Sequence, residues 1–476
     1  MLKEAICEKN RAYLKDESHF AGSATALYFP NTKQEVIEAV RQTKEVHSPL
    51  TFQGSRTGFL GGAVPREGAI LNLSHLTAMS EIEEEKGKYF LTVESGVQLA
   101  EIQKAAAKRG LFFPVQPTED TASIGGMFAV NASGPESLFY GECKDFVESV
   151  EWVTPDGEVF TVSRGKYTVT DGILPLPNGK SIDASLLSFP TLQEKAPTDL
   201  LDVLCGSEGY FGVALSLKLH LLPLPKELWG VVFFFENEDS FEKFSEATAN
   251  KRDTFEGAHL TTCEYYSKEA LALLEANIDN PLLKKLPAFP SGVTSAIYVE
   301  LEGEDEDSVT EELSLLLDEF DQCGGKEENT WAESGFEACA PFRAMRHAVP
   351  SLLNEQNSCF LSTGFRAESD FLLPIKSPCE ILAFYKDFAK AHALPLALYG
   401  SILKGQLHLF LTAPTDAQEI LFSLAKSVLE IGGTISAKYG IGKAKAPILA
   451  ALLDEASKES AQKLREFFDS IGRMNP

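Results

Sequence analysis

The sequence predicts an α+β fold arranged in more than one domain, and three observations carry this prediction. Short apolar, β-branched runs alternate along the chain with segments whose apolar residues recur at helical spacing. At 476 residues and 52.0 kDa, the chain exceeds what one hydrophobic core usually spans, and its length favours about two or three domains. A Pro-rich segment at the end of residues 204–225 separates two halves of the chain that differ in their sequence patterns. We therefore expect a first domain over residues 1–225, a second over 226–431 and a closing segment over 432–476.

The first half is predicted to open with a strand–helix–strand arrangement. Residues 31–46 begin with the cap candidate Asn31 and repeat apolar residues at helical spacing, so we expect an amphipathic helix there. The other elements that we expect in this half are strands over 48–52, 71–76 and 89–93, a helix over 98–108 ended by Gly110, and a hairpin of 146–153 and 158–162 around the turn Pro155-Asp156-Gly157.

A glycine-rich loop over residues 51–65, TFQGSRTGFLGGAVP, follows the first of these strands. Its glycines allow backbone angles that aim successive N–H groups inward, and such a nest binds an anion such as a pyrophosphate. Ser55 and Thr57 add hydroxyl donors, and Arg56 adds a positive charge. The spacing matches neither the dinucleotide nor the nucleotide-triphosphate motif, and taken alone it fits an ordinary loop equally well.

Residues 113–140 are dominated by small and hydroxylated side chains in a segment apolar enough to be buried. A buried loop needs partners for its backbone N–H and C=O groups, and a large bound cofactor would supply them. Residues 164–202 are broken by four prolines and fit either a lid over a site or a surface excursion. Residues 204–225 read as a tight glycine-rich turn followed by a strand.

The second half is predicted to be a sheet with helices on one face. The acidic run that starts at Glu302 fits the solvated start of a helix better than a metal site. The expected elements are strands over 230–235, 294–301 and 406–411, and helices over 240–251, 267–276, 302–320, 383–391 and 416–431, with a final amphipathic helix inside 432–476.

The composition and net charge of the chain argue against some classes of main binding partner and leave others open. The formal charge of −26 argues against nucleic acid or an anionic membrane as the main partner, but leaves room for a small anionic substrate in a local positive pocket. No apolar run approaches the roughly 18 residues of a membrane span, and the charged start of the chain has no signal-peptide core. The eight cysteines are scattered without a C-x-x-C pair, so we expect reduced thiols in the cytoplasm. Peripheral docking at the inner membrane face through a partner stays open.

Several motifs together resemble one known family. These are QGSRTGFLGGAVP (53–65), TASIGGMFAVNASGP (121–135), YGECKDFV (140–147), TPDGEV (154–159), GSEGYFGV (206–213), FRAMRHAVPSLLNE (342–355), LYGSILKGQLH (398–408), ISAKYGIGKAK (435–445) and RMNP (473–476). The chain resembles the flavoproteins of the vanillyl-alcohol oxidase/p-cresol methylhydroxylase superfamily, in the branch of D-lactate dehydrogenase and the glycolate oxidase subunit. The resemblance covers essentially the whole chain.

The resemblance implies an FAD-binding domain of the p-cresol methylhydroxylase type with two subdomains, followed by an α+β cap domain with an antiparallel sheet. The C-terminal segment would return to the flavin domain. The flavin would be held non-covalently, because no His stands in the glycine loop. The residues that the motif match assigns to the cofactor are Gly54, Ser55, Arg56, Thr57, Gly58, Gly62, Pro117, Thr118, Ser123, Gly125, Gly126, Asn131, Tyr140, Gly141, Glu208, Val213 and Asn475.

Oxidation of a hydroxy acid also needs a cation for the carboxylate, and Arg346 matches the family's arginine, with Arg343 one helical turn away. The family's metal run His-x-Gly-Asp-Gly-Asn-x-His is here residues 401–408, SILKGQLH, where only His408 remains. The following Glu-His-Gly is Lys438-Tyr439-Gly440. We therefore expect no bound metal. His408 fits a structural or a functional role, and Lys438 with Tyr439 either replaces the metal and the catalytic base or records a lost reaction.

The sequence thus predicts an FAD-dependent dehydrogenase that oxidises a small 2-hydroxy acid such as D-lactate or glycolate, passing hydride to flavin N5 without a divalent metal. The alternative is a flavin-binding subunit that has lost substrate oxidation and serves assembly or electron transfer in a larger complex. The electron acceptor is not specified by the sequence, and both a homo-oligomer and a partner subunit remain open.

Overall fold

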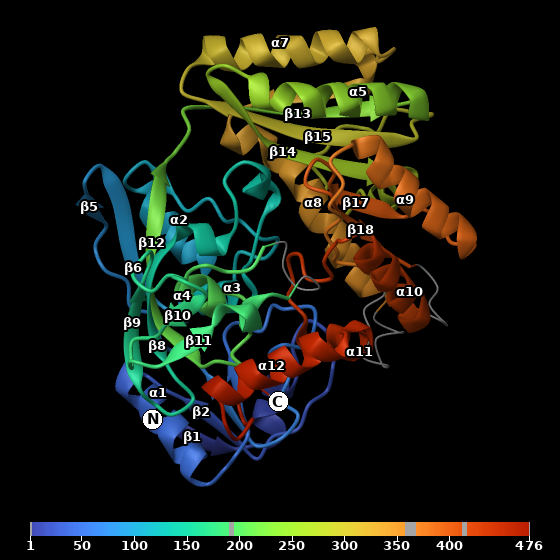
Figure 1. The fold of residues 1–476 in the computed structure, drawn as a ribbon. Coiled ribbons are helices and arrows are strands. Elements are labelled where there is room, and N and C mark those ends of the chain that lie inside the picture. Colours follow the sequence, from blue (N-terminus) through green and yellow to red (C-terminus); the bar gives the residue numbers. More distant parts are fainter. Residues whose placement is uncertain (1, 190–194, 358–367, 412–416, 476) are drawn as a thin grey trace.

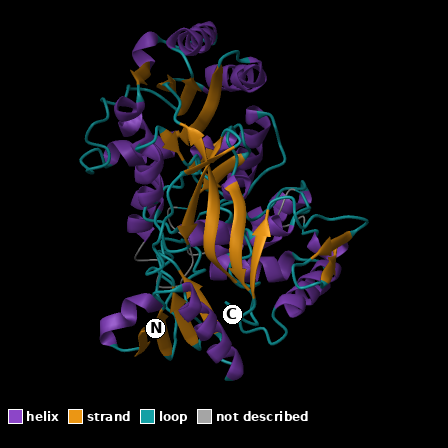
Figure 2. Cartoon of the chain, turned by 90° about the vertical axis from the view of Figure 1, so that its left-hand side faces the viewer, coloured by secondary structure: helices purple, strands orange, loops and turns teal. Residues whose placement is uncertain are grey.

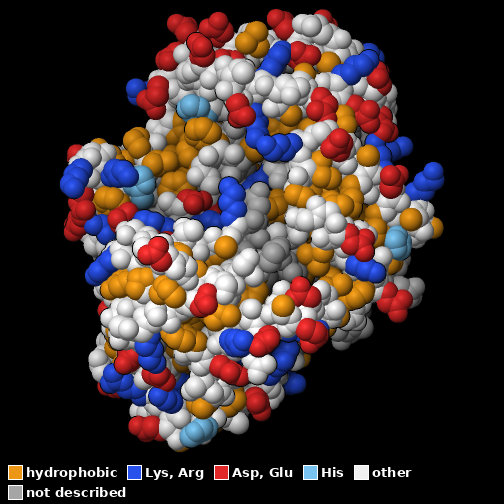
Figure 3. All heavy atoms as spheres, in the orientation of Figure 1, with side chains coloured by type: hydrophobic (Ala, Val, Ile, Leu, Met, Phe, Trp, Pro, Cys, Tyr) orange, Lys and Arg blue, Asp and Glu red, His pale blue; other side chains and the backbone are white. Residues whose placement is uncertain are grey.

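The computed structural model describes residues 2–189, 195–357, 368–411 and 417–475. The described residues form three sheets of four or more strands and one two-stranded sheet, with the N-terminal sheet at the lower end of Figure 1 and the sheet of the second half at the upper end. The view of Figure 2 shows the long strands of the middle sheet side by side. Acidic side chains are spread over much of the face in Figure 3, in keeping with the formal charge of −26. Within the described residues, no helix is both long and apolar enough to cross a membrane.

The first sheet has the order β1 (Leu2–Ala5), β2 (Ala26–Phe29), β4 (Ala69–Asn72) and β3 (Leu50–Gln53), with β4 parallel to both β2 and β3. Helix α1 (Lys33–Glu45) packs on it through Val36 and Val40. The second strand was expected over 71–76, and this placement is wrong. The strand ends at Asn72 because the Asn72 side chain accepts hydrogen bonds from the Ser74 N–H and hydroxyl, which turns the chain.

The middle sheet is antiparallel and has the order β5 (Glu83–Glu85), β6 (Lys88–Glu94), β12 (Val213–Pro223), β8 (Val147–Val153) and β9 (Val159–Ser163), with β7 (Leu111–Phe112) beside β12. The predicted hairpin is β8–β9, and the predicted helix is α2 (Leu99–Ala107). A short helix that the sequence did not predict, α3 (Ile124–Val130), lies inside the segment expected to be a loop. Ser123 caps its start, and Asn131 ends it in the left-handed region at φ +51°.

The next stretch, 164–202, is described over residues 164–189 and 195–202. They contain the two-stranded pair β10 (Ile173–Pro175) and β11 (Ser181–Asp183), followed by the short helix α4 (Leu200–Leu204). Leu187 belongs to the same buried cluster as Leu464 of the C-terminal helix α12 (Glu455–Phe468). The described part of this stretch therefore packs against the C-terminal helix rather than over the cavity described below.

The second half is built on an antiparallel sheet of order β16 (Thr330–Ser334), β13 (Glu227–Phe235), β15 (Ser295–Gly303), β14 (Ala258–Ser267), β17 (Leu398–Ser401) and β18 (Gln406–Leu409). Helices cover both faces, so the expectation of helices on one face is wrong. One face carries α5 (Glu238–Lys251), α7 (Glu306–Gln322), α9 (Pro378–Ala391) and α10 (Ala417–Glu430), and the other carries α6 (Lys268–Ala276) and α8 (Phe336–Asn357). Strand β13 explains this, because Val231 and Phe233 enter one core while Val232 and Phe234 enter the other.

The C-terminal segment returns to the first sheet, as expected. After α11 (Gly442–Leu452) and α12, Met474 lies beside Leu50 in a parallel bridge. Leu50 N–H donates to the Arg473 carbonyl at 2.9 Å, and Asn475 N–H donates to the Leu50 carbonyl at 2.8 Å. Pro476, the last residue of the RMNP motif, lies outside the described residues, as does Asp416 at the start of a predicted helix. The change of sheet between β12 and β13 agrees with a boundary near 225, and the three-part division stays a prediction.

Candidate active site

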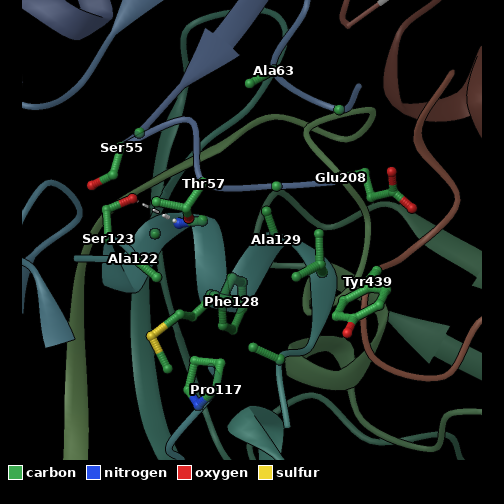
Figure 4. A pocket seen from close by; sticks show the side chains of 18 of the residues that line it. Ser55, Thr57, Ala63, Pro117, Ala122, Ser123, Phe128, Ala129, Glu208 and Tyr439 are labelled. Carbon is green, nitrogen blue, oxygen red and sulfur yellow. Dashed lines mark hydrogen bonds between the residues drawn. The ribbon is translucent and has the colours of Figure 1, made fainter. Parts of the chain in front are cut away.

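A cavity lies between the first half of the chain and the residues of the second half that face it. Figure 4 shows Ser55, Thr57 and Ser123 toward one end of this cavity and Glu208 and Tyr439 toward the other, with α3 between them. The predicted cofactor residues that line it are Gly54, Ser55, Arg56, Thr57, Gly58, Gly62, Pro117, Thr118, Ser123, Gly125, Gly126, Glu208, Val213 and Asn475. Arg346, Lys438 and Tyr439 line the same cavity. Residues far apart in the sequence thus meet around one space.

The glycine loop has the features of an anion cradle. Its backbone N–H groups from Gly54 to Gly58 donate no hydrogen bond to another described residue. A Cβ added at Gly58 would meet no atom within 4 Å, whereas a Cβ at Gly54 would overlap Ser123 Oγ. The loop therefore keeps free donors and open space on the cavity side, which fits a phosphate-bearing cofactor. The Arg56 guanidinium is committed elsewhere: it donates to the Ala12 carbonyl at 2.6 Å and lies over the Tyr13 ring.

Helix α3 forms the floor of the cavity, and its small residues allow this. Ser123 Oγ accepts a hydrogen bond from Gly126 N–H at 3.4 Å, which Figure 4 draws as a dashed line. Gly125 N–H donates to the Ser95 carbonyl at 2.9 Å, and a Cβ at Gly125 would lie 2.7 Å from the Ser95 Cβ. Glycine at position 125 is therefore required for the close packing of α3 against Ser95.

Three predicted cofactor residues lie outside the cavity lining. Asn131 caps α3 and donates to Glu142 Oε2 at 2.6 Å. The Tyr140 hydroxyl donates to Glu302 in the sheet of the second half. Gly141 has φ +102°, and a Cβ there would clash with the Asp145 carboxylate. The contacts of these three residues support the wall of the cavity, and their assignment to the cofactor stays a prediction.

Glu208 joins the two halves at the far side of the cavity. Its carboxylate accepts hydrogen bonds from the N–H groups of Ile441 and Gly442 at 2.7 and 2.8 Å. Asn475 Nδ2 donates to the Glu208 carbonyl at 2.6 Å. Burial raises the pKa of Glu208 above its ordinary value, against the effect of the two N–H donors. The C-terminal segment is thus tied to the loop that closes the cavity.

Arg346 reaches the cavity from α8 and is 3% exposed. Its Nε lies 2.7 Å from Oε2 of Glu264, which is fully buried, and its guanidinium lies over the Tyr399 ring. The two charges are paired by distance, but the N–H is not aligned with the oxygen. Nε and Nη1 of Arg346 therefore have no hydrogen-bond partner among the described residues. Burial disfavours the charge, yet Glu264 raises the pKa of Arg346, so the guanidinium stays charged.

Lys438 and Tyr439 stand on a tight turn that a buried ion pair holds. Asp370 accepts hydrogen bonds from the N–H groups of Lys438 and Tyr439 at 3.0 and 2.9 Å, and Lys445 Nζ lies 2.9 Å from Asp370 Oδ2. Lys445 also donates to the Gly440 carbonyl at 3.0 Å. Although burial opposes its charge, Lys445 helps to hold the pKa of Asp370 below its ordinary value. This clamp, Asp370 with Lys445, fixes the backbone that carries both candidate catalytic side chains.

The Lys438 ammonium group is buried, and its Nζ has no hydrogen-bond partner among the described residues. Burial, followed by repulsion from Arg346, lowers the pKa of Lys438 to about 8. A substantial fraction of this amine is therefore neutral near pH 8. The side chain can carry a positive charge or accept a proton in the same pH range.

His408 lies behind the cavity rather than in its lining. Its Nδ1 is 2.9 Å from the Ser369 carbonyl, and burial lowers the pKa of His408 to about 4, so the ring is neutral. Its ring centroid is 5.6 Å from that of Tyr439. This position supports a structural role behind Tyr439.

The positions of the family's metal run do not form a donor set. Lys404 Nζ donates to Ser137 Oγ and Glu142 Oε1 at 3.1 and 3.0 Å, and it lines no part of the cavity. Throughout the described ranges, no three His, Cys, Asp or Glu side chains gather in a way that could hold a metal ion.

Several residues that shape the site escaped the sequence interpretation. Lys445 stands in the motif over residues 435–445, but nothing local marks its buried partner Asp370. Glu264 lies in a strand that the sequence did not predict. Phe128 and Trp152 also line the cavity, and in the sequence they look like ordinary core residues.

Comparisons with known proteins agree with this geometry. Residues 24–163 match the family model of an FAD binding domain, and residues 232–476 match that of the C-terminal domain of FAD linked oxidases. The chain is 25% identical to a D-lactate dehydrogenase of Anaerostipes hadrus, covering 98% of this chain and 92% of that protein. It is 24% identical to the glycolate oxidase subunit GlcD of Bacillus subtilis, with 95% and 88% covered, and 25% identical to a D-2-hydroxyglutarate dehydrogenase of Stutzerimonas stutzeri, with 98% and 93% covered.

Among solved structures, an alkyldihydroxyacetonephosphate synthase superposes with a TM-score of 0.62 at 15% identity, over 96% of this chain and 76% of that one. This likeness shows the fold alone. The two family models together cover most of the chain, and the free N–H groups of the glycine loop fit the phosphates of the cofactor. The chain therefore belongs to the FAD-linked oxidases, and FAD is its cofactor.

Proposed function

We propose that the chain is an FAD-dependent dehydrogenase that oxidises a small 2-hydroxy acid to the 2-oxo acid without a divalent metal. The observation that carries this proposal is the shared cavity, in which Arg346, Lys438 and Tyr439 line the same space as the glycine loop and α3. A cation, a titratable amine and a phenol in one cavity with the glycine loop support binding and oxidation of a hydroxy acid there.

In the proposed reaction the alcohol loses two electrons and two hydrogens, one as a hydride from Cα and one as the proton of the hydroxyl group. Bound FAD supplies the acceptor for the hydride that leaves Cα. Arg346 binds the carboxylate, because Nη1 and Nε still have donor capacity although Glu264 is close. The neutral amine of Lys438 takes the hydroxyl proton, and Tyr439, on the same turn, orients the hydroxyl. The buried surroundings of Lys438 limit access of water to the reacting carbon.

A second candidate function is a flavin-binding subunit that no longer oxidises a substrate. The contact between Arg346 and Glu264 favours this candidate, because a buried carboxylate already neutralises the expected carboxylate anchor. A relative named as a glycolate oxidase subunit supports an assembly with partner subunits.

Anaerobic reduction of the flavin separates the two candidates. We expect D-lactate, glycolate or D-2-hydroxyglutarate to bleach the flavin absorbance of the purified protein. Arg346→Met should lower the second-order rate constant of flavin reduction by roughly 10- to 150-fold. This factor corresponds to the loss of a hydrogen bond to a charged group, which is worth about 1.5–3 kcal/mol. The matched control is Arg164→Met, since Arg164 pairs with Asp202 outside the cavity. Glu264→Gln should strengthen substrate binding by releasing Arg346. Flavin that no hydroxy acid bleaches would favour the second candidate.

A further inference from the structure

A second chamber of about 400 Å³ adjoins the cavity. It lies between α2 and residues 116–136 of the flavin-binding half and β14, β15 and α8 of the other half. Pro117, Pro135 and Arg346 line both spaces. A ligand held at Arg346 can therefore extend its far end into this second chamber.

The second chamber carries an excess of acidic groups. Two arginines line it, and each already has a carboxylate: Arg343 pairs with Glu300 and Arg346 with Glu264. His347 adds no charge, because burial lowers its pKa and its Nδ1 lies 2.7 Å from the Thr118 carbonyl. Glu136 and Asp120 remain without a cationic partner in the chamber lining. A ligand group that enters here meets uncompensated carboxyl oxygens.

Of the two carboxyl groups without a cationic partner in the chamber lining, that of Glu136 is buried. It is 5% exposed, and its Oε2 has no hydrogen-bond partner among the described residues. The charged or titratable groups around it are Glu300 and Glu302 of β15, Arg343 of α8, and Tyr140. Burial and the neighbouring Glu300 together raise the pKa of Glu136 to about 8. The side chain therefore holds a proton at neutral pH, even with Arg343 among its neighbours.

We propose that this chamber receives a primary ammonium group at the far end of the substrate, with the Glu136 carboxylate as its partner. This inference rests on the proposed function, because the ammonium group reaches the chamber only if Arg346 binds the carboxylate at the other end of the substrate. An ammonium group supplies the charge and the hydrogen-bond donors that Glu136 lacks, and Glu136 then releases its proton. The substrate class is a short hydroxy acid with an amino group at the other end of its chain.

The alternatives fit the same chamber less well. A second carboxylate, as in hydroxyglutarate, would meet Glu136 and Asp120, while Arg343 is paired with Glu300 and Arg346 holds the first carboxylate. An apolar tail would leave Glu136 Oε2 without a hydrogen-bond partner. An ammonium group satisfies the carboxyl group and compensates its charge.

The test measures binding to the FAD-loaded protein with ligands that cannot be oxidised. 4-Aminobutyrate, 5-aminovalerate and 6-aminohexanoate are compared by titration calorimetry with butyrate, valerate and hexanoate, and with glutarate. We expect at least one amino acid to bind about tenfold or more tightly than its unsubstituted partner, and glutarate to bind worst. Titrations near pH 7 in buffers of different ionisation enthalpy should show proton release. Butylammonium serves as the probe for the chamber without the carboxylate anchor.

Glu136→Gln should abolish both the ammonium preference and the proton release. Glu312→Gln is the matched control, because Glu312 of α7 is also buried, at 6% exposed, but lines neither the cavity nor the chamber. Equal binding of amino and unsubstituted acids, or a preference that survives in Glu136→Gln, would overturn the inference. Failure of the proposed function looks different: hydroxy acids would not bleach the flavin, whatever the result for the ammonium ligands.

Discussion

Lys438 is the residue on which the proposed chemistry depends most directly. Its amine is buried between two kinds of charge: Arg346 and Lys404 disfavour the ammonium form, whereas Glu264 and Asp370 favour it. Burial, together with this balance of charges, lowers the pKa of Lys438 to about 8, so the amine changes between its charged and neutral forms near that pH. A lysine at the family's metal position can thus carry a charge below this pH and accept a proton above it.

This property predicts the pH dependence of flavin reduction. The active form of a base is the neutral amine, so the second-order rate constant for anaerobic reduction should rise as the pH rises through about 8. Lys438→Met should lower this rate constant roughly 10²- to 10⁴-fold at pH 9, because a general base usually contributes a factor of that size. Lys438→Arg keeps the charge but cannot deprotonate, so its profile should be flat. A wild-type profile retained in Lys438→Met would refute the role of Lys438 as the base.

The turn that carries Lys438 and Tyr439 is stabilised by the Asp370–Lys445 clamp. Both charged groups are buried, and each satisfies backbone groups as well as its partner. Such a pair contributes little compared with two well-packed apolar residues, but removing one partner leaves a buried charge uncompensated. The clamp therefore fixes a backbone position at the site.

A single substitution in the clamp should lower the free energy of unfolding more than the double substitution does. We expect Lys445→Met to lower the free energy of unfolding by about 3–5 kcal/mol, and Asp370→Asn combined with Lys445→Met to recover part of that loss. Urea unfolding followed by fluorescence measures both. Lys243→Met is the control: Lys243 pairs with Asp239 on the exposed face of α5, so its loss should cost no more than about 0.5 kcal/mol. Additive effects of the two clamp substitutions would contradict the coupling.

Sequence reasoning succeeded where the signal was local. The glycine loop, the β8–β9 turn and the Lys438-Tyr439 pair each stand in a short motif. The relation of Asp370 to Lys445, or of Glu264 to Arg346, depends on packing between elements, and no spacing in the chain encodes it. The helices on both faces of the second sheet could have been inferred, because β13 is apolar at successive positions and not only at alternate ones.

At the scale of the molecule, the cavity is closed by residues from both halves, and the C-terminal segment completes the first sheet. Met474 is fully buried in the core that contains Leu50 and Leu71. The Asn475 side chain donates a hydrogen bond to the backbone carbonyl of Glu208. The stability of the flavin-binding half thus includes a contribution from the far end of the described chain.

Met474→Ala should therefore destabilise the flavin-binding half and loosen the cofactor. A fully buried methionine shortened to alanine costs about 2–5 kcal/mol. A thermal ramp that follows flavin fluorescence should show release of FAD at a lower temperature than in the wild type. Met79→Ala is the matched control, because Met79 is 40% exposed and should change little. An unchanged release temperature in Met474→Ala would show that the returning segment does not support the cofactor site.

The returning segment also decides how the molecule would respond to a cut in its backbone. If a protease nicked the connection between β12 and β13, the downstream fragment would still hold residues 473–475 beside β3, and Glu208 would still accept hydrogen bonds from Ile441 and Gly442. The two fragments could separate only by withdrawing a buried segment from a sheet. A nicked protein should thus run as two bands under denaturing conditions and as one flavin-bearing species in its native state.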